Sequence, residues 1–109
     1  MAVKEELKNL SDKINENPEH IEGLDYVYQF QVSGEDEGAY QVAFSNGELS
    51  YNEGEAEDPS CTIQLSGENL VKLIHGKLNA TSAFMMGQLK IKGDLSLALK
   101  LQSILQKYQ

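Results

Sequence analysis

Few side chains of this sequence are of the types that carry out acid–base or covalent chemistry. There are two histidines, His20 and His75, and a single cysteine, Cys61. A histidine can act as a general base and a cysteine as a nucleophile, provided that an activating partner lies within hydrogen-bond reach. His20 follows Asn17-Pro18 in a polar segment with no nucleophile nearby in the sequence. We therefore interpret His20 as an exposed loop residue.

Cys61 and His75 also have structural interpretations. Cys61 occupies an inward position of an expected strand, where an isolated cysteine usually serves as a small core residue. Nothing adjacent in the sequence would lower the pKa of its thiol. His75 falls in the last turn of an expected helix, where a cation interacts favourably with the helix dipole and Gly76 can terminate the helix. We predict that neither residue is catalytic.

The recurrent motifs of catalytic and cofactor sites are absent from the sequence. It contains no glycine-rich phosphate loop, no Cys-x-x-Cys pair, no histidine cluster with metal-ligand spacing and no Gly-x-Ser-x-Gly elbow. The acidic run Glu35-Asp36-Glu37 lies in a polar stretch and is typical of a solvated loop. We therefore predict no catalytic residues, no metal site, no cofactor and no enzymatic activity.

Charge is distributed unevenly along the chain. The net charge is -8, and all nine basic residues are lysines, none of them between residues 14 and 71. An acidic chain without arginine is not expected to bind nucleic acid, which requires neutralisation of phosphates. The C-terminal third is mildly basic. Its lysines either form an ordinary solubilising surface or contact an anionic head group or a membrane surface; those concerned are Lys72, Lys77, Lys90 and Lys92.

Length and composition indicate one domain. A chain of 109 residues can bury one core, so we expect a single domain over residues 1–109. No apolar run approaches the length of a membrane span, and the first ten residues have no apolar signal-peptide core. The single cysteine excludes an internal disulfide and suits a reducing compartment. We expect a cytoplasmic location.

Hydrophobic periodicity predicts a helix and then four strands in the first two thirds of the chain. Residues 3–14 carry apolar side chains at helical spacing, and Asn17-Pro18 ends that helix. Apolar and polar residues alternate in the following segments, as in strands with one buried face. These segments are residues 24–32, 40–44, 49–51 and 61–65.

The dipeptide Asn46-Gly47 is a strong hairpin signal, because a type I′ turn needs positive φ at both of its central positions. A two-residue turn there pairs Phe44 with Leu49 and Val42 with Tyr51. This register places all four apolar side chains on one side of the hairpin.

The segment Gly76–Gln102 is divided by Gly, Asn and Asp residues into short elements. Asn79 can cap a short helix that ends at Gly87. Residues 88–92 alternate as a fifth strand, and Asp94 can cap the final helix. Together with a helix capped by Ser66, these elements predict an α+β fold: a five-stranded, mainly antiparallel sheet covered on one face by about four helices.

The final helix carries apolar residues around more of its circumference than packing on one sheet requires. One stripe consists of Leu97, Leu101, Ile104 and Tyr108, while Leu95, Ala98 and Leu99 extend well around the cylinder. The wide arc must contact a second apolar surface, which could be the preceding short helix, a partner subunit or a bound ligand. Met85 and Met86 suit a surface that repacks around varied apolar shapes, although ordinary core packing is also consistent.

The C-terminal third resembles the sterol carrier protein type 2 family, which consists of small intracellular lipid-binding domains. The resemblance rests on Gly76-Lys77-Leu78, Ala83-Phe84-Met85 and Gly87-Gln88-Leu89-Lys90-Ile91-Lys92-Gly93-Asp94, followed by the Leu-rich helix. The order of the upstream elements agrees over nearly the whole chain. The resemblance implies an apolar tunnel enclosed between helices and sheet. It also implies a ligand among sterols, fatty acids, fatty acyl-CoA and phospholipids.

The chain also departs from some members of that family. It ends in Lys107-Tyr108-Gln109 and not in a Ser-Lys-Leu-like peroxisomal address, and it carries no attached enzyme domain. It is therefore similar to the stand-alone prokaryotic members.

These features predict an intracellular lipid-binding or lipid-transfer protein that holds a sterol, fatty acid or fatty acyl-CoA. The apolar residues expected to line its cavity are Leu70, Leu73, Ile74, Leu78, Phe84, Met85, Leu97, Leu101 and Ile104. One alternative is a non-enzymatic module that dimerises or docks a partner through the final helix, and the sequence does not decide between monomer and homodimer. Another is an enzyme acting on lipid-like substrates, which would need a polar group from Tyr26, Tyr28, Cys61 or His75 inside the cavity.

Overall fold

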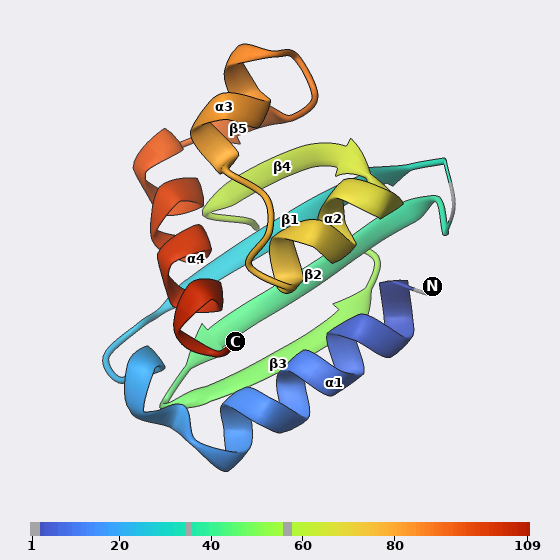
Figure 1. Cartoon of the computed structure of the whole chain (residues 1–109). Helices are drawn as coiled ribbons and strands as arrows, with labels where there is room; N and C mark the ends of the chain where they lie inside the picture. The colour runs from blue at the N-terminus through green and yellow to red at the C-terminus, as the bar shows by residue number, and fades with distance from the viewer. Residues whose placement is uncertain (1–2, 35, 56–57) are drawn as a thin grey trace.

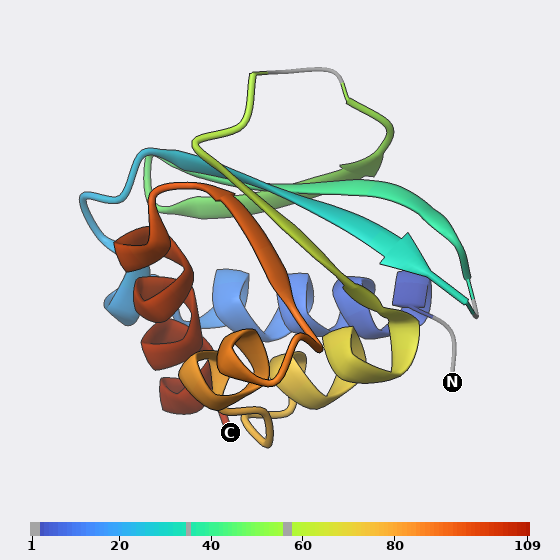
Figure 2. The same ribbon diagram turned by 90° about the horizontal axis from the view of Figure 1, so that it is seen from above.

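The computed structural model describes residues 3–34, 36–55 and 58–109, which form a five-stranded sheet with its helices on one face (Figures 1 and 2). The strands are β1 Tyr26–Ser33, β2 Gly38–Ser45, β3 Glu48–Glu53, β4 Cys61–Ser66 and β5 Lys90–Gly93. Their order across the sheet is β3-β2-β1-β4-β5. The β1–β4 pair is parallel and the other three pairs are antiparallel. The predicted α+β fold with a mainly antiparallel sheet is confirmed.

The N-terminal helix α1, Val3–Glu16, packs on the sheet through the predicted apolar stripe. Val3, Leu7, Leu10 and Ile14 are all buried. The helix ends where Asn17-Pro18 was expected to end it. The next residues form a short 3₁₀ helix, η1 Pro18–Ile21, which the sequence analysis had treated as a polar connector; its Ile21 is buried in the core.

The β2–β3 hairpin has the predicted turn and register. Asn46 and Gly47 have φ of 55° and 74°, and Phe44 pairs with Leu49. Val42 pairs with Tyr51 as predicted, so all four side chains lie on one side of the hairpin; Val42, Phe44 and Leu49 are buried, and Tyr51 is 37% exposed. The physical reason is that β3 is an edge strand, and no further strand covers the outer side of its tyrosine ring.

The three remaining helices begin at the predicted capping residues. They are α2 Gly67–Ile74, α3 Ala80–Met85 and α4 Leu95–Lys107. The side chains of Ser66, Asn79 and Asp94 accept hydrogen bonds from the first turn of the helix that each precedes. Two hydrogen bonds from Ser96 lower the pKa of the Asp94 carboxyl. Gly87, with φ of 77°, stands where α3 was expected to end.

One hydrophobic core fills the space between the helices and the sheet. Tyr28 is fully buried near its centre, and its ring meets Phe44 edge-on at a centroid distance of 5.9 Å. Cys61, Ile63 and Leu65 of β4 point into the same core, as predicted. The core therefore joins the helix-facing side of the sheet to α1, α2 and α4.

Candidate functional site

Five of the nine residues predicted to line a cavity lie in the hydrophobic core. They are Leu70, Leu73 and Ile74 of α2 and Leu101 and Ile104 of α4. All five are buried among other apolar side chains of the core cluster. In the conformation described here, these side chains pack against the core, so a ligand would have to part them.

The other four predicted residues lie at the surface of the core or outside it. Leu78 and Leu97 are half-buried and pack against the core. Phe84 is 42% exposed and Met85 is 80% exposed. The structure therefore places the nine residues at very different depths.

The orientation of α3 explains why Phe84 and Met85 point outward. This helix has six residues and buries two small side chains, those of Ala80 and Ala83. Because its core-facing positions are alanines, its large side chains project to the outside. A helix of less than two turns has too few residues for its sequence periodicity to reveal which face is buried.

We define the α3–α4 seam as the contact between α3 and α4 (Figure 1). Gln102 of α4 accepts a hydrogen bond from the backbone N–H of Ala80, with an N···Oε1 distance of 2.5 Å. Leu95 and Leu99 lie on the same face of α4 as Gln102, because they precede it by seven and three residues. Both leucines are exposed. Leu99 lines the cleft beside Tyr26 and Lys100, and neither leucine was among the predicted cavity residues.

The core accounts for only part of the wide apolar arc on α4. Ala98, Leu101, Ile104 and Leu105 bury one side of the helix in the core. Leu95 and Leu99 continue the arc onto the exposed side of the helix. The sequence predicts a second apolar contact for α4. The apolar surface near the beginning of this helix is nevertheless partly uncovered.

The polar groups nearest the core have structural partners. The Tyr28 hydroxyl donates to the backbone carbonyl of Leu97 at 2.9 Å, and burial raises the pKa of the phenol. Burial also raises the pKa of the Cys61 thiol. His75 Nε2 lies 2.6 Å from Glu6 Oε2 at the surface, linking α2 to α1. None of these contacts joins a nucleophile to a general base.

An open groove of about 600 Å³ lies beside the loop that follows α3. Val32 at the end of β1, Leu65 at the end of β4 and Leu89 before β5 supply its apolar lining. Its polar lining includes Gln31, Gln64, Ser66, Asn69, Gln88 and Lys90. The sequence analysis missed this groove, because it depends on the parallel pairing of β1 with β4, two strands distant in the sequence.

Two of the predicted cavity residues line other open clefts. Leu97 borders a cleft of about 570 Å³ next to Tyr26 and Lys100, and the Lys100 Nζ lies 5.3 Å from the centre of the Tyr26 ring. Ile74 borders a cleft of about 220 Å³ between α1, α2 and the end of α4. Within residues 3–34, 36–55 and 58–109, no group of three His, Cys, Asp or Glu residues is arranged to hold a metal ion.

The described elements form a small α+β domain, and its class follows from the family that its sequence matches. A sequence model of the SCP-2 sterol transfer family matches residues 5–106, and the chain belongs to that family. The family expected from the Gly76–Gln102 segment is thus confirmed. Among the described residues, no helix combines the length and the apolar character needed to cross a bilayer.

Solved structures and curated proteins agree with this assignment. The sterol carrier protein domain 2 of Helicoverpa armigera is 31% identical, with a TM-score of 0.77 over 94% of this chain and 84% of its own. The apo form of sterol carrier protein 2 from Yarrowia lipolytica has 23% identity and a TM-score of 0.74, covering 94% of this chain and 88% of its own.

Hydroxysteroid dehydrogenase-like protein 2 of Bos taurus is 34% identical over 106 residues, which are 95% of this chain and 25% of that protein. The rat protein of the same name is matched over 20% of its length. The chain thus spans a quarter or less of these two relatives. Their name describes proteins that are much longer than the matched domain.

Proposed function

We propose that residues 1–109 act as one lipid carrier, which holds a single sterol, fatty acid or fatty acyl-CoA between the sheet and α2, α3 and α4. Membership of the SCP-2 sterol transfer family supports this proposal. Two structural neighbours from Aedes aegypti are described with palmitate, at TM-scores of 0.70 and 0.72 and identities of 16% and 17%. Likeness at that level concerns the fold, and it makes palmitate a reasonable first probe for this chain.

The observation that carries the proposal is the shallow attachment of α3. Ala80 and Ala83 are its buried residues, and together they bury much less apolar area than two leucines would. Its first turn is also tied to α4 by the hydrogen bond between Ala80 and Gln102. Movement of α3 away from α4 would therefore cost little and would expose the side of α4 that α3 contacts.

In this proposal the predicted residues have different roles. Leu70, Leu73, Ile74, Leu101 and Ile104 form the inner wall that parts to admit an acyl chain. Leu78 forms the half-buried entrance, and Phe84 and Met85 form its outer edge, whereas Leu97 lies in the separate cleft beside Tyr26. Their different depths suit an entrance that leads from the surface into the core.

The energetics allow a reversible carrier. Removing about 15 methylenes from water at about 0.8 kcal/mol each yields about 12 kcal/mol. Association costs of about 4 kcal/mol or more, together with the cost of parting the core, leave micromolar affinity or weaker. No charged or catalytic group is needed for such binding. The free, buried Cys61 suits a reducing cytoplasm.

The first experiment is native mass spectrometry of gently purified protein, followed by titration with palmitate. We expect retained lipid, or binding of one palmitate per chain. Leu78→Ser should weaken palmitate binding about tenfold, because Leu78 lies half-buried at the entrance, directly before α3. Val71→Ser is the matched control, since Val71 is also half-buried against the core but was not assigned to the entrance. Absence of retained lipid and of palmitate binding, or equal weakening by both substitutions, would overturn the proposal.

A second candidate function is a module that dimerises or docks a protein partner through α4. The exposure of Leu95 and Leu99 favours this alternative. It predicts a molecular mass in light scattering that rises with protein concentration and falls when Leu99 is replaced by Ser. A concentration-independent monomer that binds palmitate would exclude dimerisation through this face.

A further inference from the structure

The open groove beside the loop that follows α3 lies where β4 and β5 separate. The last pair of the β4–β5 ladder is Gln64 with Lys90. Beyond that pair, Leu65 continues β4, while Leu89 belongs to the loop that joins α3 to β5. Figure 2 shows the two strands moving apart towards this loop. The groove borders the resulting gap, and we call it the β4–β5 groove. Its volume of about 600 Å³ is typical of small-molecule sites.

The apolar lining of the β4–β5 groove belongs to the hydrophobic core. Leu65 is 4% exposed and Leu89 is 2% exposed, and both are members of the core cluster. Val32, which pairs with Leu65 across the β1–β4 ladder, is the third apolar residue with a large side chain in the lining. The gap between Leu65 and Leu89 therefore gives an acyl chain a path from the groove into the core that breaks no β4–β5 pairing.

Three side-chain amides line the same groove. They belong to Gln64 of β4, Asn69 of α2 and Gln88 of the loop before β5. In the part of the chain that the structure describes, none of these three side chains has a hydrogen-bond partner in the protein. The amides of Gln29 and Gln31, by contrast, both donate to Glu55 Oε1. Each of the three amides thus offers two N–H donors and one carbonyl acceptor to a ligand in the groove.

The β4–β5 groove has no excess of positive charge. Among the described residues that line it, the charged ones are Lys90 and Glu37, whose formal charges cancel. The chain as a whole has a net charge of -8. A carboxylate head in the groove would meet repulsion from Glu37 and from the rest of the molecule, and the several negative charges of a fatty acyl-CoA would meet more.

The hydrogen-bonding pattern also discriminates between head groups. A carboxylate only accepts hydrogen bonds, so it leaves the amide carbonyls of the groove without a donor. A hydroxyl both donates and accepts, and two neighbouring hydroxyls can therefore satisfy the carbonyl and the N–H groups of facing amides. An uncharged head with two or more hydroxyls, such as the glycerol of a monoacylglycerol, matches the groove in charge and in hydrogen bonding.

We propose that the β4–β5 groove binds the uncharged, hydroxyl-bearing head of a lipid such as a monoacylglycerol, while the acyl chain passes between Leu65 and Leu89 into the core. This inference rests on the proposed function, since it requires that the core admit one acyl chain. It narrows the ligand class, because it places a neutral head above a free carboxylate and a CoA ester. Gln88 and Leu89 follow α3 closely in the chain, so movement of α3 also shifts one side of the gap.

The test compares 1-palmitoylglycerol with palmitate. The two lipids share the same acyl chain, so the ratio of their affinities reports the head group. Native mass spectrometry is performed at neutral pH with equal concentrations of both lipids, and displacement of a fluorescent fatty acid supplies the affinities. We expect about tenfold tighter binding of 1-palmitoylglycerol, from hydrogen bonds that palmitate cannot make. Palmitoyl-CoA should bind more weakly than either.

A double substitution tests the groove itself. Gln64→Ala with Gln88→Ala removes two of the three amides, and the roughly tenfold preference for 1-palmitoylglycerol should be lost. Palmitate binding should be unchanged, because the apolar path is intact. Gln106→Ala is the matched control, since Gln106 is an exposed glutamine of α4 outside the groove and should leave the preference in place. None of the three replaced side chains is buried, so far-ultraviolet circular dichroism should show unchanged folding.

The possible failures can be told apart. Palmitate that binds as tightly as 1-palmitoylglycerol, or tighter, would overturn the head-group inference and leave the carrier proposal in place. A preference that survives the double substitution, or that Gln106→Ala also removes, would do the same. Equal loss of affinity for both lipids in the double variant would show that the amides maintain the groove's structure and do not recognise a head. Binding of neither lipid to the original protein would remove the carrier proposal together with the inference.

Discussion

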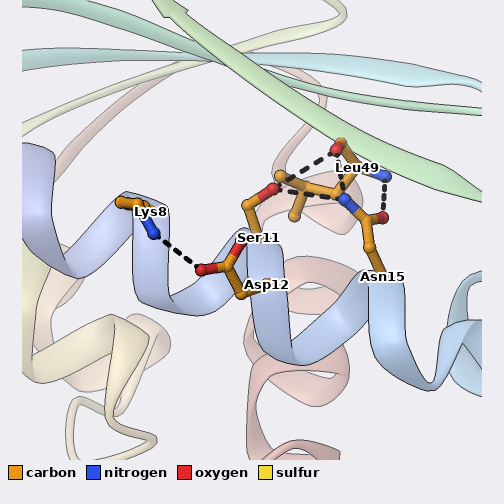
Figure 3. A network of polar contacts seen from close by, with 5 residues as sticks. All are labelled: Lys8, Ser11, Asp12, Asn15 and Leu49. Carbon is orange, nitrogen blue, oxygen red and sulfur yellow. Dashed lines mark hydrogen bonds and ion pairs between the residues drawn. The ribbon is translucent and has the colours of Figure 1, made fainter.

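The side-chain amide of Asn15 pairs with both backbone groups of Leu49, as a neighbouring strand would (Figure 3). Asn15 Oδ1 accepts from the Leu49 N–H at 2.8 Å, and Asn15 Nδ2 donates to the Leu49 carbonyl at 3.0 Å. The Ser11 hydroxyl donates to the same carbonyl at 3.5 Å. Because β3 is an edge strand, these contacts satisfy backbone groups that have no further strand to pair with. They also fix α1 across the end of the hairpin.

Replacement of Asn15 by Ala should destabilise the fold by about 1–2 kcal/mol, because both hydrogen bonds to Leu49 are lost at a partly buried position. The measurement is equilibrium unfolding in urea. Lys8→Gln is the matched control on the same helix. It removes the exposed ion pair with Asp12 and should leave the unfolding midpoint unchanged. Equal effects of the two substitutions would show that Asn15 does not anchor α1 to β3.

The parts of the fold that local chemistry determines could be predicted from the sequence. Ser66, Asn79 and Asp94 cap helices because their short side chains reach the free N–H groups of the first turn. Asn46-Gly47 fixed the hairpin register because few other residue pairs accept positive φ at both positions. These signals involve residues within a few positions of one another.

Features that depend on distant segments could not be predicted. Gln29 and Gln41 alternate with apolar residues, a pattern typical of the open face of a sheet, yet both are buried. Gln41 Nε2 donates to Gln29 Oε1 at 3.0 Å, and Gln29 Nε2 donates to Glu55 Oε1 at 2.6 Å. Glu55 comes from the loop after β3, and nothing in the sequence near either glutamine indicates this cover.

The residues of the candidate site also separate into those whose orientation local sequence predicts and those whose orientation depends on distant segments. Hydrophobic periodicity correctly placed Leu101 and Ile104 on the inner face of α4, because a helix of 13 residues presents a clear stripe. The outward orientation of Phe84 and Met85 depends on how α3 docks against α4. That docking includes the contact between Ala80 and Gln102, which are 22 positions apart in the sequence.

The buried phenol of Tyr28 predicts a loss of stability at alkaline pH. Burial raises its pKa above the ordinary value of 10.0, so the folded protein holds the phenolic proton more tightly than the unfolded chain does. The contribution of this pKa difference to the unfolding free energy is fully present below pH 10 and is lost as the pH rises above that value. Unfolding free energies measured on both sides of that pH should fall more steeply for the original protein than for Tyr28→Phe.

Tyr28→Phe should also be less stable at neutral pH by about 1 kcal/mol, because its hydrogen bond to the Leu97 carbonyl is lost. The loss of the hydrogen bond and the loss of the ionisable phenol depend differently on pH. One series of urea titrations at several pH values can therefore separate them. Cys61 and Tyr40 have raised pKa values as well, so Tyr28→Phe should reduce the alkaline slope and not abolish it. Identical slopes for the two proteins would contradict an ionisable Tyr28 in the core.

The hydrogen bond between Gln102 and Ala80 offers a test of how a lipid enters. In Gln102→Ala, the first turn of α3 loses its side-chain tie to α4, while the apolar core is unchanged. We expect the release of a fluorescent fatty acid, followed by stopped-flow mixing with acceptor vesicles, to become severalfold faster. The unfolding free energy should fall by about 1 kcal/mol or less, since the freed Ala80 N–H can bind water once the seam opens. Ser103→Ala is the control, because Ser103 is the next residue on α4 and is exposed. Unchanged release from Gln102→Ala, or equal acceleration by Ser103→Ala, would mean that the acyl chain leaves by a route other than the α3–α4 seam.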